Sequence, residues 1–212
     1  MAELVVADVH FSYPESSTEI LSGGTVHLSA GRPWLLTGPN GVGKSTWLKT
    51  VAGLLPLSRG TITHDGIRLQ RGQILYADPI PSLFDELSAL EHMELIAEMW
   101  MMNAEESEKY ISDVTDTLEI LQMVDIYCRV ENYSSGMREK LALCLILLRD
   151  ASVVLLDEPL TATDASSRDI LLKLISDRAV QNIVVVVSHI SEVALSFNAQ
   201  RLHLTDGVVH EA

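Results

Sequence analysis

The stretch Gly38-Pro39-Asn40-Gly41-Val42-Gly43-Lys44-Ser45-Thr46 decides the fold, because a predicted strand precedes it and a predicted helix follows it. Residues 33–37 are an apolar run typical of a buried strand, and residues 44–55 carry apolar side chains at the spacing of one helix face. This order matches the pattern G-x-x-x-x-G-K-[ST], whose backbone N–H groups surround a phosphate at a helix N-terminus. The alternative is a tight turn with a surface lysine. We predict a phosphate-binding loop formed by residues 38–46.

The residue types in this loop each have a chemical role. Glycines allow backbone dihedrals that a side chain would forbid, so successive N–H groups can turn toward one phosphate. Lys44 is expected to neutralise the outer phosphates, and Ser45 to offer its hydroxyl to magnesium.

A second chemical cluster follows a run of apolar residues in Val153-Val154-Leu155-Leu156-Asp157-Glu158-Pro159. The two acids would emerge at the carboxyl edge of a buried strand, where ligands bind in open α/β sheets. We predict that Asp157 holds magnesium, directly or through water, and that Glu158 orients and deprotonates an attacking water. The alternative is a pair of solvated acids at a strand end.

Length and composition limit the class of protein. The chain has 212 residues, 47% hydrophobic and 21% charged, which suits one globular domain with an inserted subdomain. Its formal charge of −14 argues against a nucleic-acid partner, because such surfaces need clustered Lys and Arg. Cys128 and Cys144 form neither a metal spacing nor a disulfide framework, as expected in a reducing compartment. The longest apolar runs are much shorter than the roughly 20 residues of a membrane span, and the N-terminus shows no secretory signal.

The pattern along the chain predicts an α/β fold in three parts. Residues 1–30 indicate a small antiparallel β subdomain, with apolar and polar residues alternating near residues 26–30. Residues 79–149 have helical periodicity and form the predicted inserted helical subdomain. The nucleotide-binding core would comprise 31–78 and 150–212, in which the Val-, Ile- and Leu-rich segments 153–157 and 183–188 suit a parallel sheet covered on both faces. We predict helices at 88–102, 104–124, 135–149 and 165–178, and hairpins turning at 64–66 and 206–207.

Between the two clusters, the run Tyr133-Ser134-Ser135-Gly136-Met137 resembles the signature of the nucleotide-binding subunits of ATP-binding-cassette (ABC) transporters. That signature is usually Leu-Ser-Gly-Gly-Gln, of which this chain keeps the serine and the second glycine. The resemblance implies that Ser134, Ser135 and Gly136 contact the γ-phosphate held by another protomer's phosphate loop. The simpler interpretation is a helix start, since Ser134 and Ser135 are good N-cap residues.

Other family positions are spread over the whole chain. Tyr13 corresponds to the aromatic that stacks on adenine, although a Tyr in a β segment can simply be packed. Asp164 corresponds to the loop that crosses the dimer interface. His189 corresponds to the histidine that contacts the γ-phosphate and positions water, with a core or capping histidine as the alternative. The family glutamine that opens the helical subdomain falls on Pro79, preceded by Asp78, and neither can replace a neutral amide unchanged.

The resemblance implies an ATPase with ATP and Mg²⁺ as ligands and Lys44, Glu158 and His189 as its catalytic residues. It also implies a homodimer or heterodimer with a second ABC ATPase subunit, and a separate transmembrane transporter subunit as partner. The protein would then be cytoplasmic and peripheral on the inner face of the membrane, and the sequence is more similar to exporter-type subunits. The alternatives are a soluble or regulatory cassette and a small-molecule kinase that uses the same loop.

Overall fold

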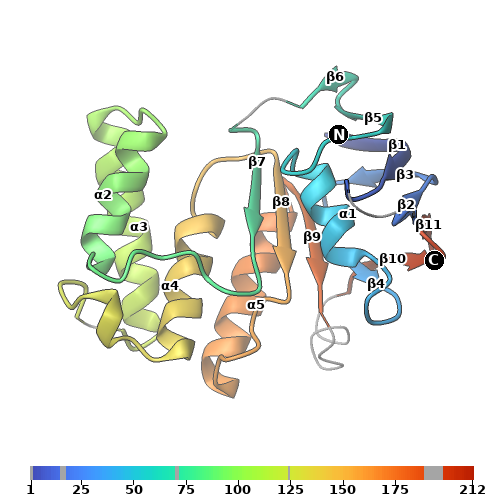
Figure 1. Cartoon of the computed structure of the whole chain (residues 1–212). Coiled ribbons are helices and arrows are strands. Elements are labelled where there is room, and N and C mark those ends of the chain that lie inside the picture. Colours follow the sequence, from blue (N-terminus) through green and yellow to red (C-terminus); the bar gives the residue numbers. More distant parts are fainter. Residues whose placement is uncertain (1, 15–17, 70–71, 124, 189–197) are drawn as a thin grey trace. The chain divides into compact units, whose positions relative to one another are not determined.

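The computed structural model describes residues 2–14, 18–69, 72–123, 125–188 and 198–212. The chain divides into two compact units. The first comprises Met1–Tyr76, Ala151–Glu158 and Ile175–Ala212, and the second Ala77–Asp150 and Pro159–Leu174. Figure 1 shows the strands of the first unit and the helices of the second.

A six-stranded sheet forms the centre of the first unit, in the order β11-β10-β4-β9-β8-β7. Neighbours from β10 through β4 and β9 to β8 are parallel, whereas β10 and β11 form an antiparallel hairpin. Every residue of β8 and β9 is buried, which explains why both strands are almost entirely Val, Ile and Leu. The strands are β4 (Trp34–Thr37), β7 (Ile74–Ala77), β8 (Val153–Asp157), β9 (Ile183–Val187), β10 (Gln200–Thr205) and β11 (Val208–Glu211).

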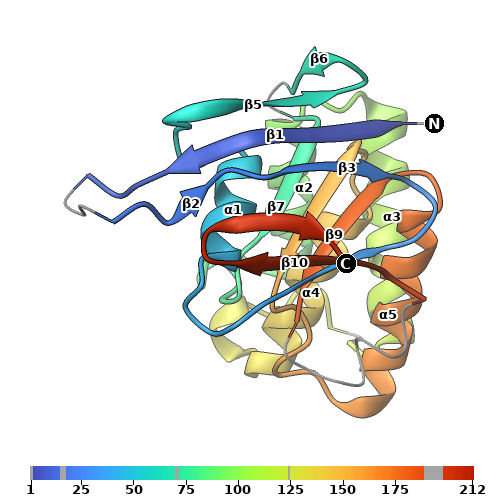
Figure 2. The same cartoon turned by 90° about the vertical axis from the view of Figure 1, so that its right-hand side faces the viewer.

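A second, antiparallel sheet is built around β1 (Glu3–Phe11), as Figure 2 shows. Strand β1 pairs with β2 (Leu21–Ser22), β3 (Thr25–Ser29) and β5 (Arg59–His64), and β6 (Ile67–Arg68) pairs with β5. The hairpin predicted around residues 64–66 is present, and it belongs to this antiparallel sheet. Its local turn signal identifies a hairpin without revealing which sheet receives it.

Helix α1 (Lys44–Val51) contributes to the core of the first unit. Leu48 and Val51 are buried, and Trp47 is 1% exposed although it lies outside the predicted apolar face. These residues cluster with apolar side chains from both sheets. Helix α1 is therefore held in place by apolar packing in a cluster that includes residues of both sheets.

The second unit is mainly helical. Its helices α2 (Ala89–Met99) and α3 (Ala104–Ile120) begin at capping boxes, Ser88 with Glu91 and Asn103 with Glu106. Helix α2 ends before the left-handed Met101, and α3 ends before the left-handed Gln122, so both are shorter than predicted. The unit also contains the 3₁₀ turn η1 (Val130–Asn132), α4 (Ser135–Leu147) and the first part of α5 (Ala165–Ala179).

The extent of the helical unit differs from the predicted segment 79–149. Residues Pro159–Leu174 also belong to it, although they follow strand β8 in the sequence. The physical reason is that the loop after β8 bonds to α4, a contact that sequence periodicity cannot reveal.

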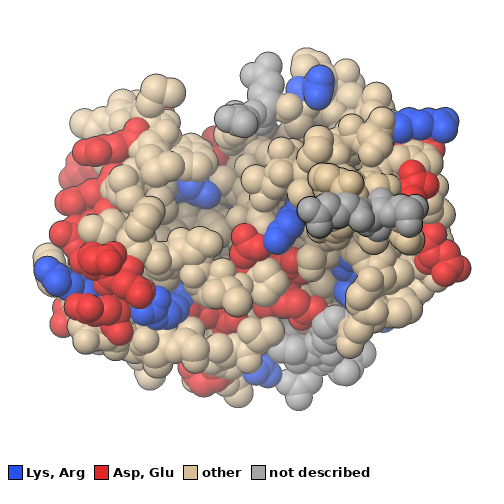
Figure 3. All heavy atoms as spheres, viewed as in Figure 1, with Lys and Arg blue, Asp and Glu red and all other residues tan. Residues whose placement is uncertain are grey.

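Acidic side chains gather over α2 and α3 in the view of Figure 3. Two of these acids, Glu105 and Glu106, lie in the first turn of α3, where their negative charges interact favourably with the positive end of the helix dipole. Among the described residues, no helix combines the length and apolarity needed to cross a bilayer.

A histidine on β1 links the antiparallel sheet to residue 19. The His10 ring lies 2.9 Å from Glu19 Oε1 through Nδ1 and 3.0 Å from Asp8 Oδ1 through Nε2. The bonds to Glu19 and then Asp8 raise the pKa of His10 above 6.5. A group whose folded-state pKa is raised contributes stability fully below its unfolded pKa, and loses it as pH rises through the folded pKa.

We therefore expect the melting temperature of the wild type, relative to His10→Gln, to fall as the pH rises above about 6.5, the ordinary pKa of histidine. Circular dichroism melting of both proteins would measure this difference. Glu19→Gln should flatten it, because that change removes the larger contribution to the shift. Parallel pH profiles for wild type and His10→Gln would contradict the assignment.

Candidate functional site

The predicted phosphate loop and the predicted acid pair lie at the same edge of the central sheet. Strand β4 leads into the loop at Gly38, β8 ends at Asp157, and β9 lies between these two parallel strands. Register pairs Leu36 and Asp157 with the same β9 residue, Val187. Two strand spacings, or about 10 Å, separate β4 from β8, so the loop and the acid pair are near enough for one ligand to contact both.

Backbone conformation and close packing both require glycine in the phosphate loop. Gly38, Gly41 and Gly43 all have positive φ, at 148°, 75° and 111°. A Cβ on Gly38 would lie 2.3 Å from the Leu204 carbonyl oxygen, and one on Gly43 would lie 2.8 Å from Ile20 Cγ2. By contrast, a Cβ on Gly41 would meet no atom within 4 Å. Gly38 and Gly43 therefore serve close packing as well as backbone conformation.

Lys44 is held inside the loop. Its Nζ donates to the carbonyl oxygens of Gly38 at 2.9 Å and Pro39 at 3.0 Å, and the residue is 7% exposed. Burial lowers the pKa of Lys44, while the charges of Glu158 and Asp157 act in the opposite direction. The ammonium is thus placed by loop carbonyls at the first turn of α1, where phosphate oxygens are favourable partners.

Asp157 has one carboxylate oxygen bonded and one free among the described residues. The Tyr76 hydroxyl donates to Oδ2 at 3.1 Å. The other oxygen, Oδ1, is buried without a hydrogen-bond partner in the described part of the chain, and the residue is 1% exposed. A buried carboxylate oxygen of this kind needs a partner, and a magnesium ion or its bound water suits it. The residues present therefore fit the metal.

The described ranges contain no group of three or more His, Cys, Asp or Glu side chains placed to hold a metal. In proteins, Mg²⁺ that is bound together with substrate phosphates generally uses one or two carboxylates instead of a dedicated cage. Ser45, exposed in the first turn of α1, is the second protein ligand that the motif predicts.

Tyr76 was not among the predicted site residues. It lies on β7, which neighbours β8 in the sheet. The only sequence signal is an aromatic residue with a hydroxyl in a strand, because its pairing with Asp157 depends on strand order. It becomes a candidate positioning residue only in the structure.

Glu158 follows β8 in a strained backbone conformation. Its φ is 50°, a left-handed value that costs a non-glycine residue about 1–3 kcal/mol. Its N–H donates to the Val187 carbonyl at 2.9 Å, which ties the residue to the end of β9. This turn directs the chain away from the strand immediately after Asp157, so the two acids have different environments.

Tyr13 and Thr46 are brought together from opposite ends of the predicted site. The Tyr13 hydroxyl lies 3.4 Å from Thr46 Oγ1, and the ring meets Phe11 edge to face, with centroids 4.8 Å apart. Tyr13 is 43% exposed, so part of its ring remains accessible for stacking.

The signature residues and Asp164 lie in the second unit. Ser134 is the N-cap of α4, and its hydroxyl accepts from the Met137 N–H at 3.2 Å. The predicted helix start is therefore present, and Ser135 is exposed in the first turn. A Cβ on Gly136 would lie 2.9 Å from the Ala162 carbonyl oxygen, so glycine is required here by packing within the unit.

Asp164 caps α5 and pairs with α4. Its carboxylate accepts from the Ser167 N–H at 2.9 Å and from the Ser166 and Ser167 hydroxyls. Lys140 Nζ lies 2.9 Å from Oδ2. These bonds, with Lys140 contributing most, hold the pKa of Asp164 well below its usual range. The carboxylate is therefore ionised across the physiological pH range.

Two further predictions concern residues outside these clusters. His189 lies outside the described residues. Pro79 and Asp78 are described and exposed, immediately after β7.

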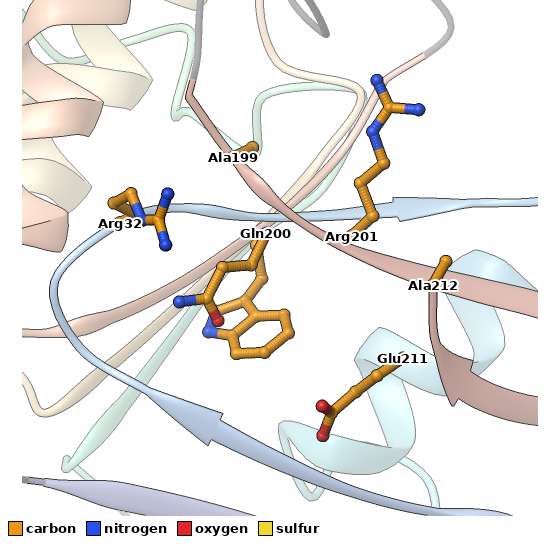
Figure 4. A pocket seen from close by; sticks show the side chains of 7 residues that line it. Arg32, Ala199, Gln200, Arg201, Glu211 and Ala212 are labelled. Carbon is orange, nitrogen blue, oxygen red and sulfur yellow. The ribbon is translucent and has the colours of Figure 1, made fainter.

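A cavity of about 350 Å³ lies elsewhere in the first unit (Figure 4). Trp34 and Gln200, which pair at the start of β4 and β10, line it together with Arg32, Arg201 and Glu211. The amino ends of parallel strands lie at the edge opposite the phosphate loop. This cavity is therefore separate from the candidate site.

Comparison with known proteins identifies the family. The family model described as ABC transporter matches residues 21–161, which include the phosphate loop, the altered signature and the acid pair. The chain belongs to the ABC transporter family. The resemblance drawn from the sequence is therefore confirmed.

Individual relatives agree with this membership. The family member "ABC transporter ATP-binding protein NatA" of Bacillus subtilis (strain 168) is 31% identical over 166 residues, covering 74% of this chain and 66% of its own length, just under two thirds. A solved structure described as the ATP binding subunit of an ABC transporter superposes with a TM-score of 0.87 at 25% identity, covering 99% of this chain and 89% of its own.

Another solved structure is a dimeric ATP-binding cassette in a post-hydrolysis state, bound to ADP and phosphate. It superposes with a TM-score of 0.82 at 23% identity, and the match covers 99% of this chain and 97% of the other chain. These likenesses confirm the α/β class with an ABC ATPase fold.

Proposed function

We propose that this ABC family chain binds and hydrolyses MgATP. The observation that carries the proposal is the shared sheet edge, at which the buried, half-partnered Asp157 lies close enough to Lys44 for their charges to interact. Phosphoryl transfer requires mainly positioning and charge stabilisation, which this edge can supply.

Each residue at the edge has a defined task in the proposed reaction. The loop N–H groups bind the phosphates, and Lys44 exchanges its carbonyl partners for outer phosphate oxygens. Asp157 and Ser45 would hold Mg²⁺, which neutralises charge developing on the phosphates when bound. Glu158 orients the attacking water and accepts its proton, and His189 contacts the γ-phosphate.

The proposed reaction uses two protomers in head-to-tail pairing. Ser134, Ser135 and Gly136 at the N-terminus of α4 would complete the site of the other protomer, with Asp164 at the crossing between the two sites. A helix N-terminus with free N–H groups attracts an anion, which supports this arrangement. The relative that is dimeric with ADP and phosphate supports it further. The second protomer would be the same chain or a homologous ABC ATPase.

We further propose that hydrolysis drives a separate membrane-spanning transporter subunit, of exporter type, with this protein on the inner face of the membrane. The runner-up is a soluble or regulatory cassette that does not drive transport. Family membership and the transporter-associated relatives favour the first. The strong negative charge disfavours cassettes that act on nucleic acid.

Three measurements test this function. Release of phosphate from ATP without any acceptor would distinguish an ATPase from a small-molecule kinase. Co-purification from detergent-solubilised membranes should recover a membrane-spanning subunit. Because Pro79 supplies no side-chain amide, hydrolysis by the isolated protein should be slow and should rise when that subunit is present. Recovery of the protein only in the soluble fraction would favour the regulatory cassette.

Tyr76→Phe should weaken the metal site without removing it. The change deletes only the hydroxyl that orients Asp157 Oδ2. Partners that orient metal ligands typically affect metal affinity 10- to 100-fold, and we expect about tenfold weaker metal binding by the nucleotide complex. Mn²⁺ titration followed by electron paramagnetic resonance would measure it.

Tyr127→Phe is the matched control for this experiment, because Tyr127 is 74% exposed. It should leave Mn²⁺ affinity unchanged. Equal Mn²⁺ affinities for wild type and Tyr76→Phe would show that the hydroxyl does not position the carboxylate.

A further inference from the structure

A buried carboxylate on α4 binds the loop that follows β8. Glu139 is 5% exposed, and its two oxygens accept four hydrogen bonds from residues 161–163. Oε1 accepts from the Thr161 N–H at 2.9 Å and from the Thr161 hydroxyl at 3.1 Å. Oε2 accepts from the Ala162 N–H at 3.0 Å and from the Thr163 hydroxyl. One side chain therefore satisfies two consecutive amides and two hydroxyls of this loop.

The loop depends on such a partner for its conformation. Leu160 is fully buried with φ of 77°, a left-handed value that is strained for a branched side chain. Strained residues persist only where their surroundings over-determine them. Thr163 is 4% exposed, so its hydroxyl also needs a partner within the protein. The carboxylate of Glu139, on helix α4, both holds the strained loop and accepts the hydrogen bond of the Thr163 hydroxyl.

Two further contacts join the same pair of segments. The Gly136 backbone approaches the Ala162 carbonyl so closely that a Cβ would lie 2.9 Å from its oxygen. Lys140 pairs with Asp164 at 2.9 Å. Residues 136, 139 and 140 therefore fix residues 161–164 at several points, all within the second unit. The first turns of α4 and the loop form one connected structure.

We propose that Glu139 is a positioning residue that fixes loop 160–164 against the signature turn 133–137. Both segments then meet the second protomer as one body, and a shift of either moves the other. This inference rests on the proposed function, in which both segments contribute to a site shared between protomers. It adds a link between them that the site residues themselves do not supply.

The chemistry of the contact requires a carboxylate. Each oxygen faces one backbone N–H, and a backbone N–H cannot turn away or become an acceptor. A glutamine has the same size, but its NH₂ group would face one of these donors. Glu139→Gln therefore breaks one side of the contact without creating a cavity, which makes it the sharpest probe.

Hydrogen exchange on the full chain without nucleotide tests the link directly. In Glu139→Gln, we expect the amides of Thr161 and Ala162 to exchange about tenfold faster than in wild type, as expected for loss of a charge-assisted hydrogen bond. Amides of β8 should be unaffected. Glu94→Gln makes the same chemical change at an exposed position of α2, and should leave all of these rates unchanged.

Steady-state kinetics separate positioning from general stability. Glu139→Gln should lower kcat for ATP hydrolysis about tenfold, while KM stays within about twofold because the phosphate loop belongs to the first unit. Thr163→Val removes one hydroxyl donor at nearly constant volume and should act in the same direction. Thr163→Ser keeps the hydroxyl and should retain wild-type kcat. A merely structural role would not separate these two variants.

Three results would overturn the proposal. Unchanged exchange at Thr161 and Ala162 in Glu139→Gln would show that the carboxylate does not hold the loop. Faster exchange with unchanged kcat would show that holding the loop does not matter for the reaction. Should Glu139→Gln fail to fold, equal kcat for Thr163→Val and Thr163→Ser would refute the proposal. Absence of hydrolysis by the wild type would instead refute the proposed function, while exchange would still decide whether Glu139 holds the loop.

Discussion

Glu158→Gln is expected to stop ATP hydrolysis while leaving ATP binding intact. Glu158 directly follows the proposed metal ligand Asp157, and a glutamine there keeps the shape but cannot accept a proton. Loss of a general base typically costs 10²- to 10⁴-fold in rate, and we expect a fall in kcat within that range. Measurement of phosphate release under saturating ATP would establish it.

The same variant should accumulate an ATP-bound dimer, because hydrolysis is the step proposed to separate the protomers. Gel filtration with light scattering should show a doubling of mass on addition of MgATP. Glu98→Gln, at an exposed position of α2, is the matched control and should behave as wild type in both assays. Wild-type phosphate release by Glu158→Gln would eliminate the assignment of this residue as the base.

Lys44→Ala is expected to remove nearly all nucleotide affinity. The Lys44 ammonium, buried and bonded to the carbonyls of Gly38 and Pro39, would no longer offset the negative charge of the outer phosphates. Loss of charge-assisted hydrogen bonds worth about 2–4 kcal/mol corresponds to a 30- to 1,000-fold weaker Kd. Isothermal titration calorimetry with ATP would measure the change.

Lys109→Ala is the control, since Lys109 is an exposed lysine on α3. It should titrate like the wild type. Melting temperatures of both variants would show whether the fold is retained. Normal ATP affinity in a folded Lys44→Ala protein would contradict the phosphate-loop assignment.

Much of the fold could be predicted because the informative signals are local. The alternation of Val26 and Leu28 with polar neighbours, the apolar run ending at Asp157, and the turn at Asp206 each report on a few consecutive residues. Val26 and Leu28 are buried, β8 spans the predicted residues 153–157, and Asp206 joins β10 to β11. Periodicity and turn chemistry are sufficient for such features.

What could not be predicted depends on pairings between distant segments. Tyr76 becomes relevant to the proposed metal site because β7 lies beside β8. From the sequence, Glu139 is indistinguishable from an ordinary exposed polar residue of a helix. It is buried because the loop of residues 160–164 packs against it. For the same reason, the sequence predicts the hairpin at residues 64–66 but not the sheet to which it belongs. Spacing along the chain does not encode these long-range choices.

The contact between Gly38 and Leu204 has a consequence for synthesis of the protein. The phosphate loop is complete in sequence by residue 46, yet its first glycine packs against a carbonyl that is translated 166 residues after it. Strand β4 also lies between β9 and β10, and both of these strands are translated long after it. A nascent chain therefore has the phosphate-binding motif long before it has the walls that shape it. The loop can therefore reach its final geometry only after β9 and β10 have been translated and have paired with β4.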